Sequence, residues 1–180
     1  MTGDAPFEEV LERVVEVFER AGIVHALIGA LAVAAWGAPR ATEDIDLLAD
    51  AAPSARLDVA LGEAGFVPEW RRGDPDDPVP LLLRLVGAAG VPDVDVLCVT
   101  RAWEREMLGR AVRVRIPGGA EVSVVTAEDL IVLKLLAGGP GDLADVAELL
   151  IRTGPLPDLD ARAAARGVLD LLRRIRAALA

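Results

Sequence analysis

The stretch that decides the fold runs from residue 28 to residue 48 and reads IGALAVAAWGAPRATEDIDLL. Its pattern predicts the end of a strand at 23–28, a short helix at 31–36 and a second strand at 44–48. Side chains alternate between the two faces of a strand. Asp44 and Asp46 therefore share one face, whereas Ile45 and Leu47 point into the core.

Asp44 and Asp46, as a pair of carboxylates on one strand face, form a candidate cation site. The two acids repel each other unless a cation lies between them, and hard oxygen ligands suit Mg²⁺ or Mn²⁺. A solvated edge strand with two surface acids is the alternative. Asp95 lies inside a second apolar strand expected at 94–99, where a buried carboxylate needs a partner. Asp93 follows a proline and is assigned to the rim of the site.

Gly29 marks a turn between a predicted strand and a predicted helix. Backbone N–H groups at such a turn can hold a phosphate, although a plain turn is the more common use of one glycine. Lys134 is the second candidate contact to an anion, because the other 18 basic residues are arginine. It lies in an apolar helix expected at 127–137, and a buried ammonium needs a carboxylate or a nucleotide phosphate. A lysine that reaches solvent at a helix edge is the alternative.

The rest of the chain predicts an α+β fold in two parts. Residues 1–125 form a mixed-sheet core flanked by helices, and residues 126–180 form a helical segment packed on that core. Within the core we expect helices that end near Gly22, at 53–64 and at 101–109, a loop at 71–80, and strands at 79–86, 111–116 and 121–125. The C-terminal part predicts helices at 127–137, 142–152 and 159–179.

Composition excludes several classes of protein. The 180 residues carry a formal net charge of −10, which disfavours extended binding to nucleic-acid backbone. One cysteine excludes a disulfide framework, and His25, the one histidine, excludes a site with two imidazoles. No apolar run is long enough for a membrane span, and residues 1–9 lack a basic signal-peptide region. We expect a soluble cytoplasmic protein.

The motif around Asp44 resembles the nucleotidyltransferase superfamily of the DNA polymerase β type. It is most similar to small bacterial members related to AbiEii-type toxins. The family pattern has an apolar strand, Gly-Gly or Gly-Ser, a short helix, Gly-x-x-Arg-x-Thr-x-Asp-Ile-Asp and a later hydrophobic-Asp-hydrophobic strand. The matching residues are Gly29, Gly37, Arg40, Thr42, Asp44, Ile45, Asp46 and Asp95. The resemblance covers residues 8–150.

The resemblance implies a metal-dependent transfer of a nucleotidyl group from an NTP to a hydroxyl of a small molecule, a protein or an RNA end. Asp44, Asp46 and Asp95 would bind Mg²⁺ or Mn²⁺, and Asp95 could also accept the proton of the hydroxyl. The implied nucleotide-binding residues are Gly29, Ala30, Arg40, Thr42 and Lys134. The same resemblance raises the possibility of a toxin with a cognate antitoxin protein.

Two other functions compete with this one. Ala30 stands where the family has Gly or Ser, so its backbone N–H is kept and a hydroxyl is absent. That departure favours a non-catalytic protein on the same fold that binds a nucleotide or a partner. A glycosyltransferase with an Asp-x-Asp motif is the third hypothesis, but 180 residues are few for a sugar-nucleotide domain and an acceptor domain.

Overall fold

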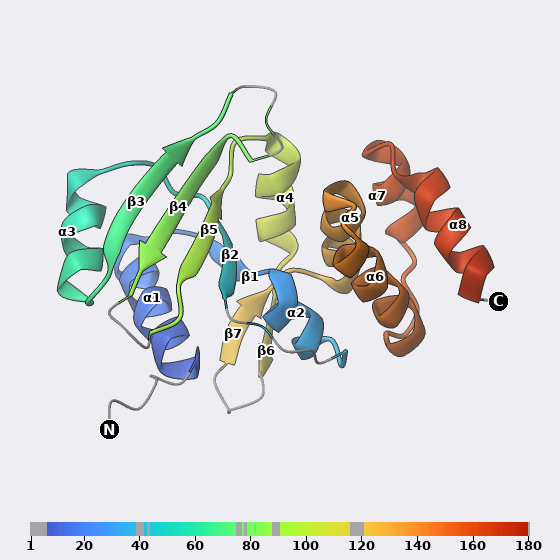
Figure 1. Cartoon of the computed structure of the whole chain (residues 1–180), viewed down its shortest axis with the longest axis horizontal. Helices are drawn as coiled ribbons and strands as arrows, with labels where there is room; N and C mark the ends of the chain where they lie inside the picture. The colour runs from blue at the N-terminus through green and yellow to red at the C-terminus, as the bar shows by residue number, and fades with distance from the viewer. Residues whose placement is uncertain are drawn as a thin grey trace.

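A mixed β-sheet lies at the centre of the computed structural model, which describes residues 7–38, 42, 44–74, 77, 79–87, 91–115 and 121–179 (Figure 1). Its strands are β1 (His25–Leu27), β2 (Ile45–Ala49), β3 (Val67–Arg72), β4 (Leu81–Val86), β5 (Val94–Cys98), β6 (Val112–Arg115) and β7 (Glu121–Val124). Their order across the sheet is β3-β4-β5-β2-β1-β7-β6. The β2–β5 and β1–β7 pairs are parallel, and the other pairs are antiparallel.

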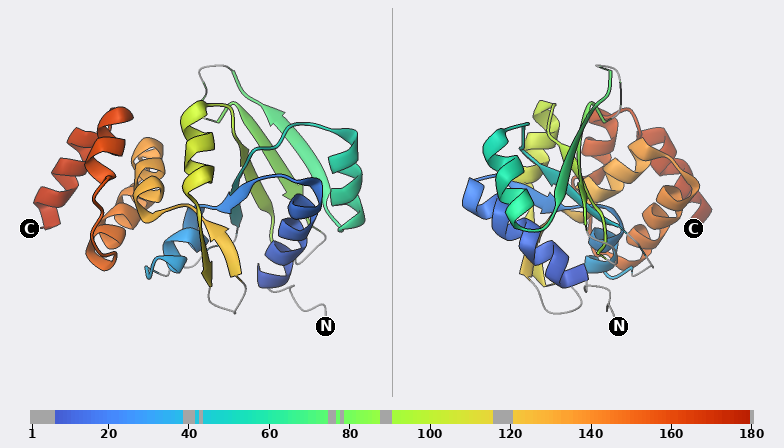
Figure 2. Two further views of the ribbon diagram at one scale, coloured as in Figure 1. Left: turned by 180° about the vertical axis from the view of Figure 1, so that it is seen from behind. Right: turned by 60° about the vertical axis from the view of Figure 1, so that its left-hand side comes forward.

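Helices cover the sheet unevenly. They are α1 (Phe7–Ala21), α2 (Gly29–Ala35), α3 (Ala55–Glu63), α4 (Ala102–Arg110), α5 (Ala127–Ala137), α6 (Pro140–Arg152), α7 (Leu159–Ala165) and α8 (Leu169–Leu179). Helices α1, α3 and α4 pack on one face, and α2 and α5–α8 lie on the other side (Figures 1 and 2). The face on that side is left partly uncovered over β3, β4 and β5. We call it the open face.

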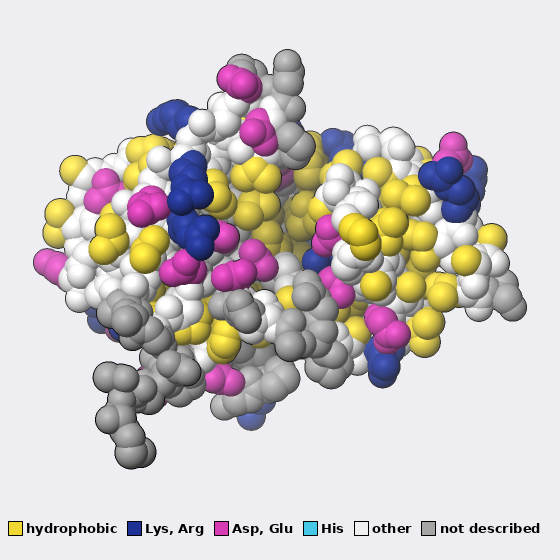
Figure 3. Space-filling model, in the orientation of Figure 1, with side chains coloured by type: hydrophobic (Ala, Val, Ile, Leu, Met, Phe, Trp, Pro, Cys, Tyr) yellow, Lys and Arg dark blue, Asp and Glu magenta, His cyan; other side chains and the backbone are white. Residues whose placement is uncertain are grey.

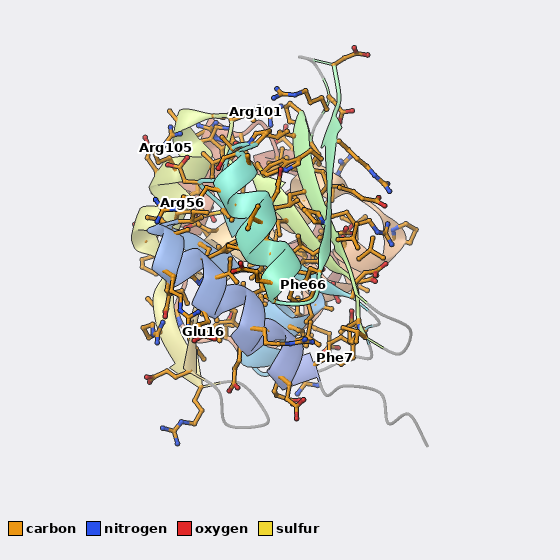
Figure 4. All side chains as sticks on the ribbon, turned by 90° about the vertical axis from the view of Figure 1, so that its left-hand side faces the viewer. Phe7, Glu16, Arg56, Phe66, Arg101 and Arg105 are labelled. Carbon is orange, nitrogen blue, oxygen red and sulfur yellow. The ribbon has the colours of Figure 1, made fainter. Side chains whose placement is uncertain are left out.

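Strand alternation explains which face is covered. Ile45 and Leu47 on β2 are almost fully buried, as are Val94 and Val96 on β5. These side chains share the face under α1, α3 and α4 and form the core with the apolar stripe of α1. The intervening residues of both strands point to the open face. Figure 4 shows α1 and α3 next to each other on the covered side of the sheet, with Phe66 close to both helices.

The expected α+β class is confirmed, and two expected elements differ from the structure. Strand β3 falls in a segment where the sequence analysis predicts no strand. Its proline, Pro68, and its charged side chains are not typical of a strand pattern, although an edge strand accommodates them. The last helix, expected as one piece at 159–179, is broken into α7 and α8. Gly167 causes the break, since its φ of +74° is a left-handed conformation that ends a helix.

No helix in the described part of the chain combines the length and the apolar character that crossing a membrane requires.

Candidate functional site

A row of charged residues crosses four neighbouring strands on the open face. Asp46 on β2 is the register partner of Asp95 on β5, and Asp95 is the partner of Arg84 on β4. Arg84 is in turn opposite Glu69 on edge strand β3. Register partners on adjacent strands project from the same face. The sheet therefore brings together two acids that are 49 positions apart in the sequence and places a cation next to them.

Asp44 lies on the same face, just before β2 begins and two residues before Asp46. The N–H of Ile45 donates to the carbonyl of Asp93, 3.1 Å away, so the β2–β5 pairing continues to this point. Thr42 fixes the backbone here: its hydroxyl donates to the Asp44 carbonyl at 3.1 Å and accepts from the Asp44 N–H at 3.3 Å. The Asp44 side chain is exposed. In this structure the Thr42 hydroxyl therefore stabilises the turn of the backbone on which Asp44 lies.

Gly29 packs directly against Asp46. The N–H of Ile28 donates to the Asp46 carbonyl at 3.0 Å, and α2 begins at the next residue. Gly29 has a φ of +63°, and a Cβ there would lie 1.9 Å from Oδ2 of Asp46. A glycine is therefore required by both conformation and space. Ala30 is buried, and the first N–H groups of α2 have no acceptor inside the helix.

Asp95 has a partly buried carboxylate. Its Oδ1 atom is buried and has no hydrogen-bond partner within the described residues. Burial raises the pKa of Asp95 above its ordinary value. The guanidinium of Arg84 opposes that rise, and the carboxylates of Asp44 and Asp93 add to it. A buried carboxylate oxygen without a hydrogen bond is energetically costly, and an added cation would satisfy it.

Arg84 is bonded to Asp93 rather than to its register partner. Its Nη2 atom donates to Oδ2 of Asp93 at 2.6 Å, whereas its Nε atom is 4.0 Å from Oδ1 of Asp95. The hydrogen bond to Asp93 raises the pKa of Arg84, so this side chain is a permanent cation. Sequence analysis did not select Arg84. The sequence feature that could have identified Arg84 is that it is the single charged residue inside the apolar run 81–86.

The donor set on the open face fits a hard divalent cation in chemistry. Asp46 and Asp95 face each other by register, Asp44 adjoins them, and Asp95 carries an unsatisfied oxygen. Within the described residues, no three His, Cys, Asp or Glu side chains already form a cluster that could hold a metal ion. The structure thus shows the three acids on one face and not in a closed coordination shell.

Lys134 has carboxylate partners. Its Nζ atom is 2.9 Å from Oδ1 of Asp142 and 2.9 Å from Oδ2 of Asp145, both on α6. Burial alone would lower the pKa of Lys134, but the hydrogen bonds to the two carboxylates outweigh it and the pKa is raised. Of the two anions that the sequence left open, the structure supplies carboxylates. The ammonium joins α5 to α6, and its expected contact with nucleotide stays a prediction.

An ion-pair network around the buried carboxylate of Asp129 fixes the C-terminal helices beside the sheet. Asp129 on α5 accepts two hydrogen bonds from Arg110, at 2.9 and 3.0 Å, and its Oδ2 atom is 2.9 Å from Nη1 of Arg162 on α7. Arg166 adds a second link, 5.1 Å above the ring of Trp103 on α4. Bidentate arginine pairs of this kind set a definite orientation. Sequence analysis did not assign these arginines a role.

The open face and these helices border a hollow. Figure 3 shows acidic and basic side chains together over the strands, and an apolar depression between the sheet and the C-terminal helices. A separate groove of about 840 Å³ lies between α1 and α3 on the covered side of the sheet, with Glu16 and Arg56 among its lining residues (Figure 4). That groove carries charges of both signs and lies away from the row of charged residues on the open face.

Arg40, an expected nucleotide contact, lies outside the described residues.

Comparison with known proteins identifies the fold. No protein-family model and no curated protein sequence matches the chain. Among solved structures, the antibiotic-resistance factor ANT(2'')-Ia is 15% identical with a TM-score of 0.62, and the match covers 92% of this chain and 94% of that one. The lincosamide antibiotic adenylyltransferase LnuA, solved with lincomycin, is 14% identical with a TM-score of 0.55, covering 84% and 100%.

A nucleotidyltransferase-like protein from Paracoccidioides brasiliensis is 18% identical with a TM-score of 0.51, and the match covers 93% of this chain and 91% of that one. At these identities the matches establish the fold and leave the activity open. The chain has the α+β fold of nucleotidyltransferases.

Proposed function

We propose that the protein is a metal-dependent nucleotidyltransferase that moves a nucleotidyl group from an NTP to a hydroxyl of a small molecule. The observation that carries this proposal is the pairing of Asp46 with Asp95 on the open face, next to the Gly29 turn. The fold supports it, because solved structures with this fold include an adenylyltransferase for lincosamides and ANT(2'')-Ia with adenylyl-tobramycin.

Asp44, Asp46 and Asp95 are the residues that would hold Mg²⁺ or Mn²⁺. Bound there, the ion would supply charge stabilisation at the phosphates and make the acceptor hydroxyl more acidic. The first N–H groups of α2, including that of Ala30, face no helical acceptor and would be available to the phosphates. The missing hydroxyl at Ala30 removes one side-chain contact and leaves these backbone donors in place.

The residues then account for the transfer itself. The hydroxyl oxygen of the acceptor forms a bond to the α-phosphorus of the NTP, and the bond from that phosphorus to the bridging oxygen breaks. Pyrophosphate leaves, and Asp95 accepts the hydroxyl proton. The apolar hollow beside the row offers room for the body of a small acceptor (Figure 3).

Label transfer tests this function. The protein is incubated with Mg²⁺, a set of hydroxyl-bearing small molecules that includes aminoglycosides and lincosamides, and each NTP labelled on the α- or the γ-phosphate. We expect the α-label on the acceptor and release of pyrophosphate, and no transfer by Asp46→Asn. Transfer of the γ-label would indicate a kinase instead. Nucleotide binding without any transfer would favour the non-catalytic alternative. A role as a toxin with an antitoxin partner stays a prediction from sequence.

A further inference from the structure

We propose that Asp93 is a positioning residue, which holds the guanidinium of Arg84 away from Asp95 and so keeps the Asp95 carboxylate available to a divalent cation. This inference rests on the proposed function, since it assumes that Asp95 is a cation ligand. It assigns Asp93 a role of its own, in contrast to the rim position that the sequence predicts for it.

The geometry shows an arginine that is hydrogen-bonded to a diagonal neighbour and not to its register partner. Arg84 and Asp95 are register partners on antiparallel strands, the arrangement in which opposite charges usually pair. Arg84 instead donates its short hydrogen bond, 2.6 Å long, to Asp93, which is the diagonal neighbour. The Nε atom of Arg84 stays 4.0 Å from Oδ1 of Asp95, and within the described residues that oxygen has no hydrogen bond.

An arginine and a divalent cation compete for the same carboxylate. A guanidinium that binds a carboxylate through two N–H groups occupies the oxygens that a metal ion would use. Its charge also repels the ion. Arg84 can reach Asp95 without a change in the sheet, because both side chains project from the same face. The ion pair with Asp93 therefore divides the two acids: Asp93 takes the hydrogen bond of Arg84, whereas Asp95 keeps only a long ion-pair contact of 4.0 Å with it.

A double-mutant cycle on Mn²⁺ affinity tests the proposal. Mn²⁺ binding is measured by calorimetry, without nucleotide, for the native protein, Asp93→Asn, Arg84→Gln and the double variant. We expect Asp93→Asn to weaken Mn²⁺ binding about tenfold, the size of a coupling between neighbouring charges. In the Arg84→Gln background the same change should have little effect, because no arginine is left to move onto Asp95.

The cycle separates positioning from two simpler effects. If Asp93 is itself a metal ligand, or acts only through its charge, Asp93→Asn weakens Mn²⁺ binding equally in both backgrounds, and the proposal is overturned. Glu69→Gln is the matched control, because it removes a carboxylate from the same row without removing the hydrogen bond of Arg84. It should weaken binding much less than Asp93→Asn does, and an equal effect would also overturn the proposal.

Two further results keep the test decisive. Unfolding curves in metal-free buffer show whether each variant is folded, and Asp93→Ser replaces Asp93→Asn if the latter is not. A native protein that binds no Mn²⁺ would overturn the metal-binding part of the proposed function and this inference with it. A native protein that binds Mn²⁺ with an affinity unchanged by Asp93→Asn would overturn this inference alone.

Discussion

Asp46 lies so close to the Cα atom of Gly29 that no other residue fits at position 29. An ideal Cβ there would be 1.9 Å from Oδ2 and 2.6 Å from Cγ of Asp46. Gly29 also begins α2 with a φ of +63°. One position thus ends the first strand, starts the helix and leaves space for a carboxylate of the candidate site. The conformational requirement and the site requirement coincide at this turn.

Gly29→Ala should therefore damage the site by displacing Asp46. We expect Mn²⁺ affinity and nucleotidyl transfer to fall by at least about tenfold, together with a loss of stability above the roughly 1 kcal/mol that a left-handed backbone costs an alanine. Gly37→Ala is the matched control. Gly37 has a φ of +89°, but a Cβ there meets nothing within 4 Å, so the backbone cost arises without the collision. Equal losses in both variants would show that the contact with Asp46 is unimportant.

Asp95→Asn should nearly abolish transfer. The substitution removes both a proposed cation ligand and the proposed proton acceptor, and loss of a general base alone costs about 10²–10⁴-fold in rate. The measurement is the rate of pyrophosphate release with Mg²⁺ and the NTP that labels the acceptor. Glu69→Gln, at the far end of the row, should retain most of the rate. If Asp95→Asn keeps a rate within a few-fold of the native protein, the assignment of Asp95 is wrong.

The same substitution should not destabilise the metal-free protein at neutral pH. Burial raises the folded-state pKa of Asp95 above its ordinary value of 3.8, so the folded protein holds this proton more tightly than the unfolded chain does. Stability is then lost as the pH rises from the unfolded pKa through the folded one. Asparagine does not ionise, so the Asp95→Asn variant should be more stable than the native protein only at pH values above that range. Chemical unfolding in chelator at several pH values checks the sign, and a variant less stable at neutral pH would contradict it.

Much of the site was predictable because a strand alternates with a period of two. Asp44 and Asp46 fall on one face with Ile45 between them, and the apolar neighbours of Asp95 identify it as a strand residue. The pairing of Asp46 with Asp95 needed the strand order, which no local pattern contains. Arg84 entered the site for the same reason: its place next to Asp95 is set by β4 lying beside β5.

Other features depended on tertiary contacts that override local propensity. Strand β3 forms because β4 offers it a full set of backbone partners, although Pro68 and three charged residues weaken its pattern. Trp70 on β3 adds a contact to the covered face, because its Nε1 atom donates a hydrogen bond to Oδ1 of Asp58 on α3 at 2.8 Å. The sequence showed that Lys134 needs an anion, and only the packing of α5 on α6 shows which one.

Lys134→Met should destabilise the protein far more than it weakens nucleotide binding. The substitution leaves the carboxylates of Asp142 and Asp145 without their cation, and an uncompensated buried charge costs roughly 3–5 kcal/mol of unfolding free energy. Arg152→Ala is the matched control, because it breaks an exposed ion pair with Glu148 that is worth about 0–1 kcal/mol.

The stabilising effect of Lys134 should also depend on pH. The folded-state pKa of Lys134 is raised above its ordinary value of 10.5, so its contribution to the free energy of unfolding is complete below that pH and is lost as the pH rises through the folded-state pKa. Denaturant unfolding of both variants at neutral pH and at high pH measures this difference. A stable Lys134→Met protein with lost NTP affinity would instead restore Lys134 to the nucleotide site.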